Sequence, residues 1–447
     1  MVKISFLGGC REIGKSAILL ESEVTGDLIL LDYGTKMNDP ENCFPEHVPG
    51  KKLKGIVLSH AHIDHSGAIP LFYISGSVPL YCTELTYVIT EILLKDMINI
   101  SEIYLPFDKS EIERMGKFTQ FLPYRKRQQI GENIFVTLYQ SGHIPGGALT
   151  LIEMDGKSIL YTSDFNLTQT QLLKPCDTDL PPIDCLIMES TYGTTIREER
   201  KVVEDKIIAA IRKIIVNSGK VLIPAFGVSR SQELLMVLFR DGIPPYPVYL
   251  DGLARKVSRV YLQYPKEFRD YKALEFAINN VHMIVQKKRQ MERSQVLNYP
   301  GVMIAPSGML KGGTSRIYAS KLVNDPDSAI YLVSYQAEDS PGKVLMTEKK
   351  YVKKAFMDES EIDEREEEPG SEEIKLDANV QVEFFDFSSH SGMDQLIQFA
   401  KSMKFTNESK KVYCVHGDEP VLLEFVETLK KEGFDANGPV RKDTVII

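Results

Sequence analysis

The 447-residue sequence has no run of about 18 apolar residues, so we predict no membrane-spanning helix. It shows no secretion signal either, because its opening residues, MVKISFLGG, read as a short strand ending in glycines. It has no C-x-x-C pair, which argues against a zinc knuckle or a disulfide framework and for a reducing, cytoplasmic environment. Its six cysteines stand far apart, at positions 10, 43, 82, 176, 185 and 414.

The sequence also lacks an excess of positive charge, since Lys and Arg total 53 against 62 for Asp and Glu. The net charge of −9 resides in one stretch, 358–373, where ten acidic residues and one arginine sum to −9. The rest of the chain is close to neutral, so net charge neither favours nor excludes a nucleic-acid partner. We expect the acidic stretch to be a solvated loop, because a block of like charge cannot bury enough surface to order itself.

The length and the 43% hydrophobic content predict two or three packed domains. The first half is β-rich, with a hairpin signal at Asp155-Gly156. From about residue 196, strands and helices alternate, which predicts a parallel, three-layer α/β domain. The segments after the acidic stretch suggest a return to the first domain. The strands expected in the first half are 3–7, 16–21, 28–32, 55–59, 148–154, 157–162 and 184–189.

The most informative pattern is His60-Ala61-His62-Ile63-Asp64-His65, which follows the predicted strand 55–59. Open α/β sheets place their sites just past the carboxyl ends of strands. His60 and His62 can point to the same side of an extended loop, while Asp64 and His65 turn to a second point. One metal ion cannot easily accept all four ligands at this spacing, whereas two adjacent ions can. Imidazole and carboxylate ligands suit Zn²⁺, with Mn²⁺ or iron as alternatives.

Two further residues fit the same site. His143 lies in a glycine-rich loop, SGHIPGG, at a strand end, and Asp164 ends the second strand of the predicted hairpin. Alone, each would be an ordinary loop histidine or turn aspartate. Together with the histidine cluster they become ligand candidates, and Asp164 could bridge both ions.

These residues make the chain resemble the metallo-β-lactamase superfamily, whose motifs are matched in order by Asp32, the cluster 60–65, His143 and Asp164. The resemblance implies an α/β fold: an αββα sandwich from residues 1–194 and 385–447, with a three-layer α/β β-CASP domain inserted at 195–384.

The later motifs resemble those of the β-CASP ribonucleases within that superfamily. Glu189 in ESTYG matches the acidic motif, and His390 in FSSHSG and His416 in VHGD match two histidine motifs. The stretches LGGCREIG and PSGMLKGG are also typical. The chain looks similar to archaeal homologues of the endonuclease subunit of the cleavage and polyadenylation specificity factor. Those relatives often begin with KH-type RNA-binding domains, which we do not expect here because the core starts at residue 1.

The resemblance implies two Zn²⁺ ions, with Mn²⁺ as an alternative. His60, His62 and His143 would hold one ion, Asp64, His65 and His416 the other, and Asp164 would bridge them. Asp32 would orient a ligand.

Asp64 could also accept a proton from the attacking water. His390, paired with Glu189, could donate to the developing phosphorane. Candidate RNA or phosphate contacts are Ser388, Ser389, Ser391, Gly308, Gly312, Gly313, Arg230 and Lys311.

The leading hypothesis is a zinc-dependent ribonuclease that cuts single-stranded RNA in 3′-end processing, transcription termination or decay. Endonucleolytic and 5′→3′ exonucleolytic action both remain open. A different di-zinc hydrolase is a weaker alternative, because small substrates need neither a second domain nor His390. A DNA nuclease is disfavoured because that branch of the family usually carries valine where this chain has His416. We expect a homodimer formed through the tail 438–447, and no membrane partner.

Overall fold

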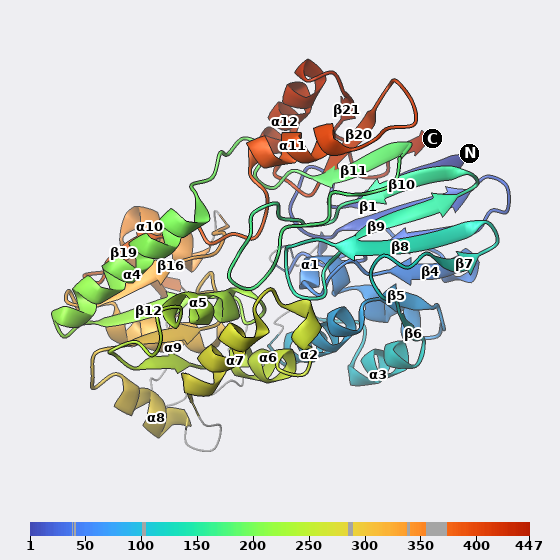
Figure 1. Cartoon of the computed structure of the whole chain (residues 1–447). Helices are drawn as coiled ribbons and strands as arrows, with labels where there is room; N and C mark the ends of the chain where they lie inside the picture. The colour runs from blue at the N-terminus through green and yellow to red at the C-terminus, as the bar shows by residue number, and fades with distance from the viewer. Residues whose placement is uncertain (38, 40–41, 101–103, 285–288, 338–339, 355–372) are drawn as a thin grey trace. The chain divides into compact units, whose positions relative to one another are not determined.

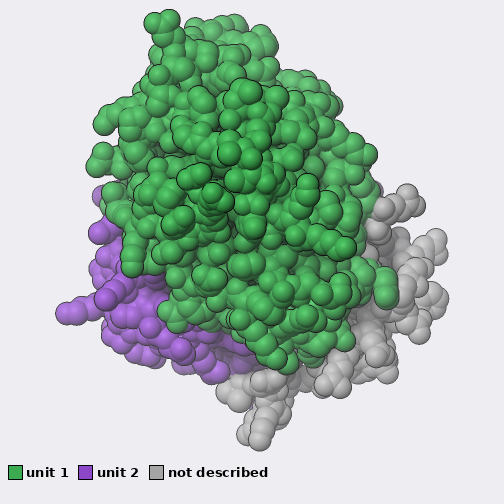
Figure 2. All heavy atoms as spheres, turned by 90° about the vertical axis from the view of Figure 1, so that its right-hand side faces the viewer, with its two compact units in different colours: residues 1–169, 175–197, 389–447 green, residues 170–174, 198–388 purple. Residues whose placement is uncertain are grey.

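The computed structural model describes residues 1–447 apart from 38, 40–41, 101–103, 285–288, 338–339 and 355–372. The acidic stretch predicted to be a loop, 358–373, therefore lies outside the described residues except for Glu373. The chain forms two compact units (Figure 2). Unit 1 comprises residues 1–169, 175–197 and 389–447, and unit 2 comprises 170–174 and 198–388.

Unit 1 contains two seven-stranded sheets (Figure 1). The first has the order β22-β1-β2-β3-β4-β5-β6 and the second the order β21-β20-β11-β10-β9-β8-β7. In the first sheet the strands are β1 (Val2–Gly8), β2 (Ala17–Ser22), β3 (Leu28–Leu31), β4 (Leu53–Val57), β5 (Leu80–Cys82), β6 (Thr119–Phe121) and β22 (Thr444–Ile446). In the second they are β7 (Gln128–Gly131), β8 (Ile134–Gln140), β9 (Ala148–Met154), β10 (Lys157–Tyr161), β11 (Cys185–Glu189), β20 (Lys411–Val415) and β21 (Asp435–Asn437).

Strand alternation builds three apolar cores in unit 1. Ile134, Val136 and Leu138 of β8 join the core between the two sheets. The opposite face of the second sheet packs on α11 (Met393–Ser402) and α12 (Glu419–Lys431), and the opposite face of the first on α2 (Glu84–Ile100) and α3 (Lys109–Lys117). This stacking confirms the predicted αββα sandwich.

The hairpin predicted at Asp155-Gly156 is confirmed. Both residues have positive φ, 50° and 76°, and Met154 pairs with Lys157 across the turn. Positive φ at both central positions matches the twist of the flanking strands. The hairpin thereby sets the register of β10, whose far end leads to Asp164.

Both predicted bounds of the strand before the histidine cluster are wrong by two residues. The strand expected at 55–59 is β4, Leu53–Val57, because pairing with β3 begins at Leu53. The histidine cluster therefore starts after a two-residue connection, Leu58-Ser59, rather than directly after the strand.

Unit 2 is built on a six-stranded sheet with the order β14-β13-β15-β12-β16-β19, in which every pairing is parallel. β15 and β16 are buried at every residue, so both faces of the sheet are covered, as expected for a three-layer α/β domain. The strands are β12 (Lys220–Pro224), β13 (Val248–Leu250), β14 (His282–Met283), β15 (Gly301–Ala305), β16 (Ala329–Leu332) and β19 (Gln381–Phe384). The helices include α4 (Arg200–Val216), α5 (Arg230–Leu238), α6 (Leu253–Tyr261), α7 (Tyr271–Asn280), α8 (Arg289–Val296), α9 (Gly313–Leu322) and α10 (Pro341–Glu348).

Across the described part of the chain, no helix combines the length and the apolar character needed to cross a membrane. All six cysteines are free and buried.

Candidate metal centre

The predicted ligands come from loops that follow the carboxyl ends of strands in both sheets of unit 1. The cluster 60–65 follows β4 and runs into the single turn α1 (Ile63–Ser66). His143 follows β8, Asp164 follows β10, and His416 follows β20. The sandwich thus gathers residues that are up to 356 positions apart in the sequence (416 − 60), all of them within unit 1.

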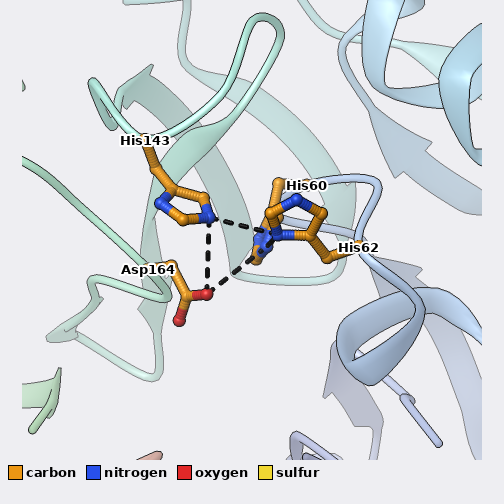
Figure 3. Close-up of side chains that lie close together, drawn as sticks. All are labelled: His60, His62, His143 and Asp164. Atoms are coloured by element: carbon orange, nitrogen blue, oxygen red, sulfur yellow. Dashed lines mark hydrogen bonds and ion pairs between the residues drawn. The ribbon is translucent and has the colours of Figure 1, made fainter. Parts of the chain in front are cut away.

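His60, His62, His143 and Asp164 form one group whose ligand atoms lie close enough to share an ion. His62 Nδ1 lies 3.1 Å from Nε2 of both His60 and His143. Asp164 Oδ2 lies 3.6 Å from the same two Nε2 atoms. Figure 3 shows the four side chains pointing toward one another.

Asp64, His65 and His416 form a second group. His416 Nε2 lies 3.2 Å from Asp64 Oδ2, and His416 Nδ1 lies 3.1 Å from Asp164 Oδ1. His65 Nε2 lies 3.5 Å from the same Asp164 oxygen. These two groups have the same members as the two ligand sets that the resemblance implies.

Asp164 stands between the two groups. One carboxylate oxygen faces His60 and His143, and the other faces His65 and His416. The side chain is only 2% exposed, and its Oδ1 accepts no hydrogen bond with good geometry from the described residues. A buried carboxylate oxygen left in this way is costly unless something else compensates it. The donor set of imidazoles and carboxylates suits Zn²⁺, so the residues fit a metal pair.

The lowered pKa values of the three histidines in the first group favour the binding of a cation. Burial lowers the pKa of His60 and His143 well below the usual range, and lowers the pKa of His62 to about 4. All three imidazoles are therefore neutral at pH 7, and neutral imidazole is the form that binds a metal.

The second group differs. Burial opposes protonation of His65, but the carboxylates of Asp164 and Asp64 raise its pKa well above the usual value. Burial likewise opposes ionisation of Asp64, yet His65 and a hydrogen bond from His416 hold its pKa below the usual value. A cation at this position would replace the proton on His65.

Asp32 lies beside the second group and is fully buried. Its Oδ2 lies 2.8 Å from His65 Nδ1 and also accepts hydrogen bonds from Ser59 Oγ at 2.7 Å and Tyr161 Oη at 3.0 Å. A carboxylate on Nδ1 fixes the tautomer and leaves His65 Nε2 directed at the cluster. No sequence pattern pointed to Ser59, Tyr161 or Ser163, whose hydroxyl lies 2.6 Å from that of Ser59.

His390 pairs with Glu189. His390 Nδ1 lies 2.9 and 2.8 Å from the two Glu189 oxygens, and its Nε2 lies 3.9 Å from Asp164 Oδ2. Burial lowers the pKa of His390, but Glu189 and Asp164 outweigh it and raise the pKa above the usual value. Glu189 also lies within ligand distance of Asp164 and His416, so its geometry would also allow a ligand role.

The serines around His390 are buried. His143 Nδ1 lies 2.8 Å from the carbonyl oxygen of Ser389, and Ser391 Oγ accepts a hydrogen bond from the Leu167 amide at 3.0 Å. Ser388, in unit 2, receives a hydrogen bond from Arg200 on its carbonyl oxygen at 3.0 Å. These contacts position the loop, a role that the sequence did not indicate.

The remaining predicted RNA contacts lie at the carboxyl ends of strands in unit 2. Gly308 follows β15, Gly312 is the N-cap of helix α9, and Gly313 is the first residue of that helix. Lys311 is exposed, whereas Arg230 is 7% exposed and donates a hydrogen bond to the Val333 carbonyl at 3.2 Å.

Comparisons with known proteins agree with this architecture. Residues 19–186 match the metallo-beta-lactamase superfamily domain, 231–345 the Beta-Casp domain, and 375–439 the Zn-dependent metallo-hydrolase RNA specificity domain. A solved structure from Enterococcus faecalis, titled as a protein of unknown function, matches with a TM-score of 0.60 at 14% identity and covers 100% of both chains. That likeness concerns the fold alone.

Three curated relatives are archaeal. RNase aCSPSF2 of Saccharolobus solfataricus is 35% identical, over 96% of this chain and 82% of that protein. Probable RNase MJ4 of Methanocaldococcus jannaschii is 32% identical, over 98% of each. Transcription termination factor FttA of Pyrococcus abyssi is 32% identical, over 99% of this chain and 71% of that protein. The chain belongs to the β-CASP family of metallo-β-lactamase-fold RNases, together with these archaeal relatives of the cleavage and polyadenylation specificity factor.

Proposed function

We propose that this protein is a zinc-dependent ribonuclease that hydrolyses phosphodiester bonds of single-stranded RNA. The observation that carries the proposal is the position of Asp164, whose two oxygens face two separate ligand groups. This arrangement suits two cations that share one carboxylate. The relatives named as RNases and the match to an RNA specificity domain support RNA as the substrate.

Seven residues would hold the metals. Two Zn²⁺ ions bound there would lower the pKa of a water molecule toward neutrality and neutralise charge on the phosphate; Mn²⁺ could serve in their place. The first ion would be held by His60, His62 and His143, the second by Asp64, His65 and His416, and both by Asp164.

His390 is proposed to donate a proton or a hydrogen bond to the reacting phosphate. Glu189 holds its Nδ1 at 2.8 Å and favours the protonated imidazole, which leaves Nε2–H available on the side of Asp164. The low pKa of Asp64 makes it a better ligand than proton acceptor, because a carboxylate with a low pKa is a weak base.

Unit 2 is proposed to contact the RNA backbone near Gly308 and the N-terminus of α9. Gly313, the first residue of α9, and Lys311 are exposed there, and Lys311 adds positive charge. The amides of a helix N-terminus suit a phosphate. The serines at 388, 389 and 391 remain weaker candidates because they are buried.

The test uses single-stranded RNA labelled at its 5′ or 3′ end, with and without a 5′ monophosphate, beside DNA of the same sequence. Purified protein should cut the RNA, lose activity with a strong chelator and regain it with Zn²⁺. Internal fragments from both labels would indicate endonucleolytic cleavage, and mononucleotides released from the 5′ label would indicate 5′→3′ exonucleolytic cleavage. Preferential cutting of DNA, or full activity after metal removal confirmed by elemental analysis, would contradict the proposal. We propose 3′-end processing, transcription termination or decay as the biological setting, on the basis of relatives named as RNases and as a transcription termination factor.

A homodimer through the tail 438–447 is also proposed. The last strand, β22, pairs with β1 and is the terminal strand of the first sheet, so its outer edge could receive a second chain. Light scattering of the full chain and of a chain lacking residues 444–447 tests this, since an unchanged mass would contradict it.

A further inference from the structure

The loop joining β1 to β2, residues 9–16, contacts all three members of the second ligand group. The Gly9 carbonyl accepts a hydrogen bond from the His416 amide at 2.7 Å. The Ser16 amide donates to the Asp64 carbonyl at 2.9 Å, and Ser16 Oγ lies 3.3 Å from His65 Nε2. These three ligands come from two distant parts of the sequence, and the loop joins them.

The packing of the loop is too tight for side chains at two places. A Cβ on Gly8 would lie 1.9 Å from the Lys15 carbonyl oxygen. A Cβ on Gly34, whose amide donates to the Ser16 carbonyl at 3.0 Å, would lie 1.7 Å from the Asp64 carbonyl oxygen. Gly34 therefore lies directly against both the loop and the Asp64 backbone.

A buried lysine of the loop, Lys15, forms ion pairs that hold the loop in place. Lys15 is 1% exposed, and its Nζ lies 3.1 Å from Glu12 Oε1 and 3.8 Å from Asp39 Oδ2. Glu12 also accepts from Lys36 Nζ at 2.9 Å. A buried ammonium group is stable only with such partners. Removing it would leave Glu12 paired with Lys36 alone and would remove the link between Glu12 and Asp39.

The loop is braced at its other end as well. Arg11 donates from Nε and Nη2 to the Gly438 carbonyl at 3.1 and 3.0 Å, and from Nη1 to Glu419 at 2.9 Å. Glu419 begins helix α12, just after the His416 loop. The brace thus ties the loop to the segment that carries His416.

The first ligand group is supported elsewhere. His143 Nδ1 lies 2.8 Å from the Ser389 carbonyl oxygen, and His60 Nδ1 lies 3.1 and 3.2 Å from the hydroxyls of Ser59 and Ser163. Ser59 and Ser163 also reach the second group, because Ser59 donates to Asp32 and Ser163 Oγ lies 3.3 Å from His65 Nδ1, so this support is shared. The contacts of the β1–β2 loop given above go to members of the second group, so a change in the loop should affect the two groups unequally.

We propose that the β1–β2 loop, held by the buried Lys15 through its ion pair with Glu12, positions Asp64, His65 and His416 as one metal subsite and sets the affinity of that subsite more than that of the other. The inference rests on the proposed two-metal function. Lys15 is a positioning residue, since its ammonium group pairs with Glu12 and Asp39 and it acts on the ligands through the loop backbone. Supporting residues of this kind typically alter metal affinity by about 10- to 100-fold.

The experiment measures metal content rather than cleavage. Wild type, Lys15→Met, Lys15→Arg and Lys3→Met are equilibrated against chelators of graded strength, and zinc per chain is measured by mass spectrometry. Lys3, whose ion pair with Glu21 is exposed, is the matched control. We expect two zinc ions per chain in wild type, Lys15→Arg and Lys3→Met. At the same free zinc concentration Lys15→Met should hold one, with the zinc affinity of its weaker site reduced at least about tenfold.

Cadmium NMR then identifies which subsite has changed. The resonance weakened in Lys15→Met should be the one lost in His416→Ala and retained in His62→Ala. If Lys15→Met does not fold, Arg11→Met serves instead, because it removes the brace to Gly438 and Glu419 and touches no ligand; we expect weaker binding at the same subsite. Unchanged zinc affinity, or equal loss at both subsites, would overturn the inference. Fewer than two zinc ions in wild type would instead refute the two-metal function on which it rests.

Discussion

Replacing Asp164 with asparagine tests the candidate centre most directly. The amide has the same shape as the carboxylate, so the substitution removes charge without creating a cavity. It also places an N–H₂ group, which cannot bind a cation, on one side of the centre. In the native chain Asp164 Oδ2 lies 3.6 Å from Nε2 of both His60 and His143. Asp164 Oδ1 lies 3.5 Å from His65 Nε2 and 3.1 Å from His416 Nδ1.

The magnitude follows from these distances. A unit positive charge about 3.5 Å from the carboxylate interacts with it by about 5 kcal/mol at an effective dielectric of about 20. The amide dipole should recover up to about half of that energy. The remaining loss of about 2.5 to 5 kcal/mol corresponds to a decrease of roughly 10² to 10⁴-fold in cleavage rate, if the charge is needed in the transition state.

The assay is single-turnover cleavage of labelled RNA at saturating enzyme, with zinc content measured on the same samples. Asp184→Asn is the matched control, because Asp184 is another buried carboxylate and accepts from the Ser158 amide at 2.9 Å, at the opposite end of β10. It should lose about 1–2 kcal/mol of stability and keep its cleavage rate. A folded Asp164→Asn protein that cleaves within about tenfold of wild type would refute the reasoning.

The site residues that could be predicted from the sequence are those that lie close together along the chain. His60, His62, Asp64 and His65 stand within one short stretch after an apolar strand, and strand ends are where sites form. The αββα sandwich was predictable only with the family resemblance, but the Asp155-Gly156 turn needed no more than its own two residues.

The rest depends on contacts between distant parts of the chain. Lys15 looks like a solvated surface lysine, and its burial against Glu12 follows from the way the β1–β2 loop packs on Gly34 and Asp64. The pairing of His390 with Glu189 spans 201 residues, so only the family motifs could suggest it. No periodicity or composition can report such pairs, because they are created by the sandwich itself.

Three further predictions concern other groups. His390→Ala should retain both metals yet slow cleavage by about 10²–10⁴-fold, as expected for loss of a proton donor; loss of zinc would show instead that His390 is a ligand. Arg293→Met should destabilise unit 2 by about 1.5–3 kcal/mol, because it removes a charged hydrogen bond of 2.7 Å and leaves Asp251 with Arg255, 3.8 Å away, as its cation; an unchanged melting temperature would contradict this. Glu204 is buried, which raises its pKa above the ordinary 4.5 although Gln171 donates to it. The folded state therefore binds this proton more tightly than the unfolded state, and stability falls as pH rises from about 4.5 through the raised pKa. Glu204→Gln removes that loss, so its melting temperature relative to wild type should increase between pH 4 and pH 8, and a difference independent of pH would show that Glu204 does not titrate abnormally.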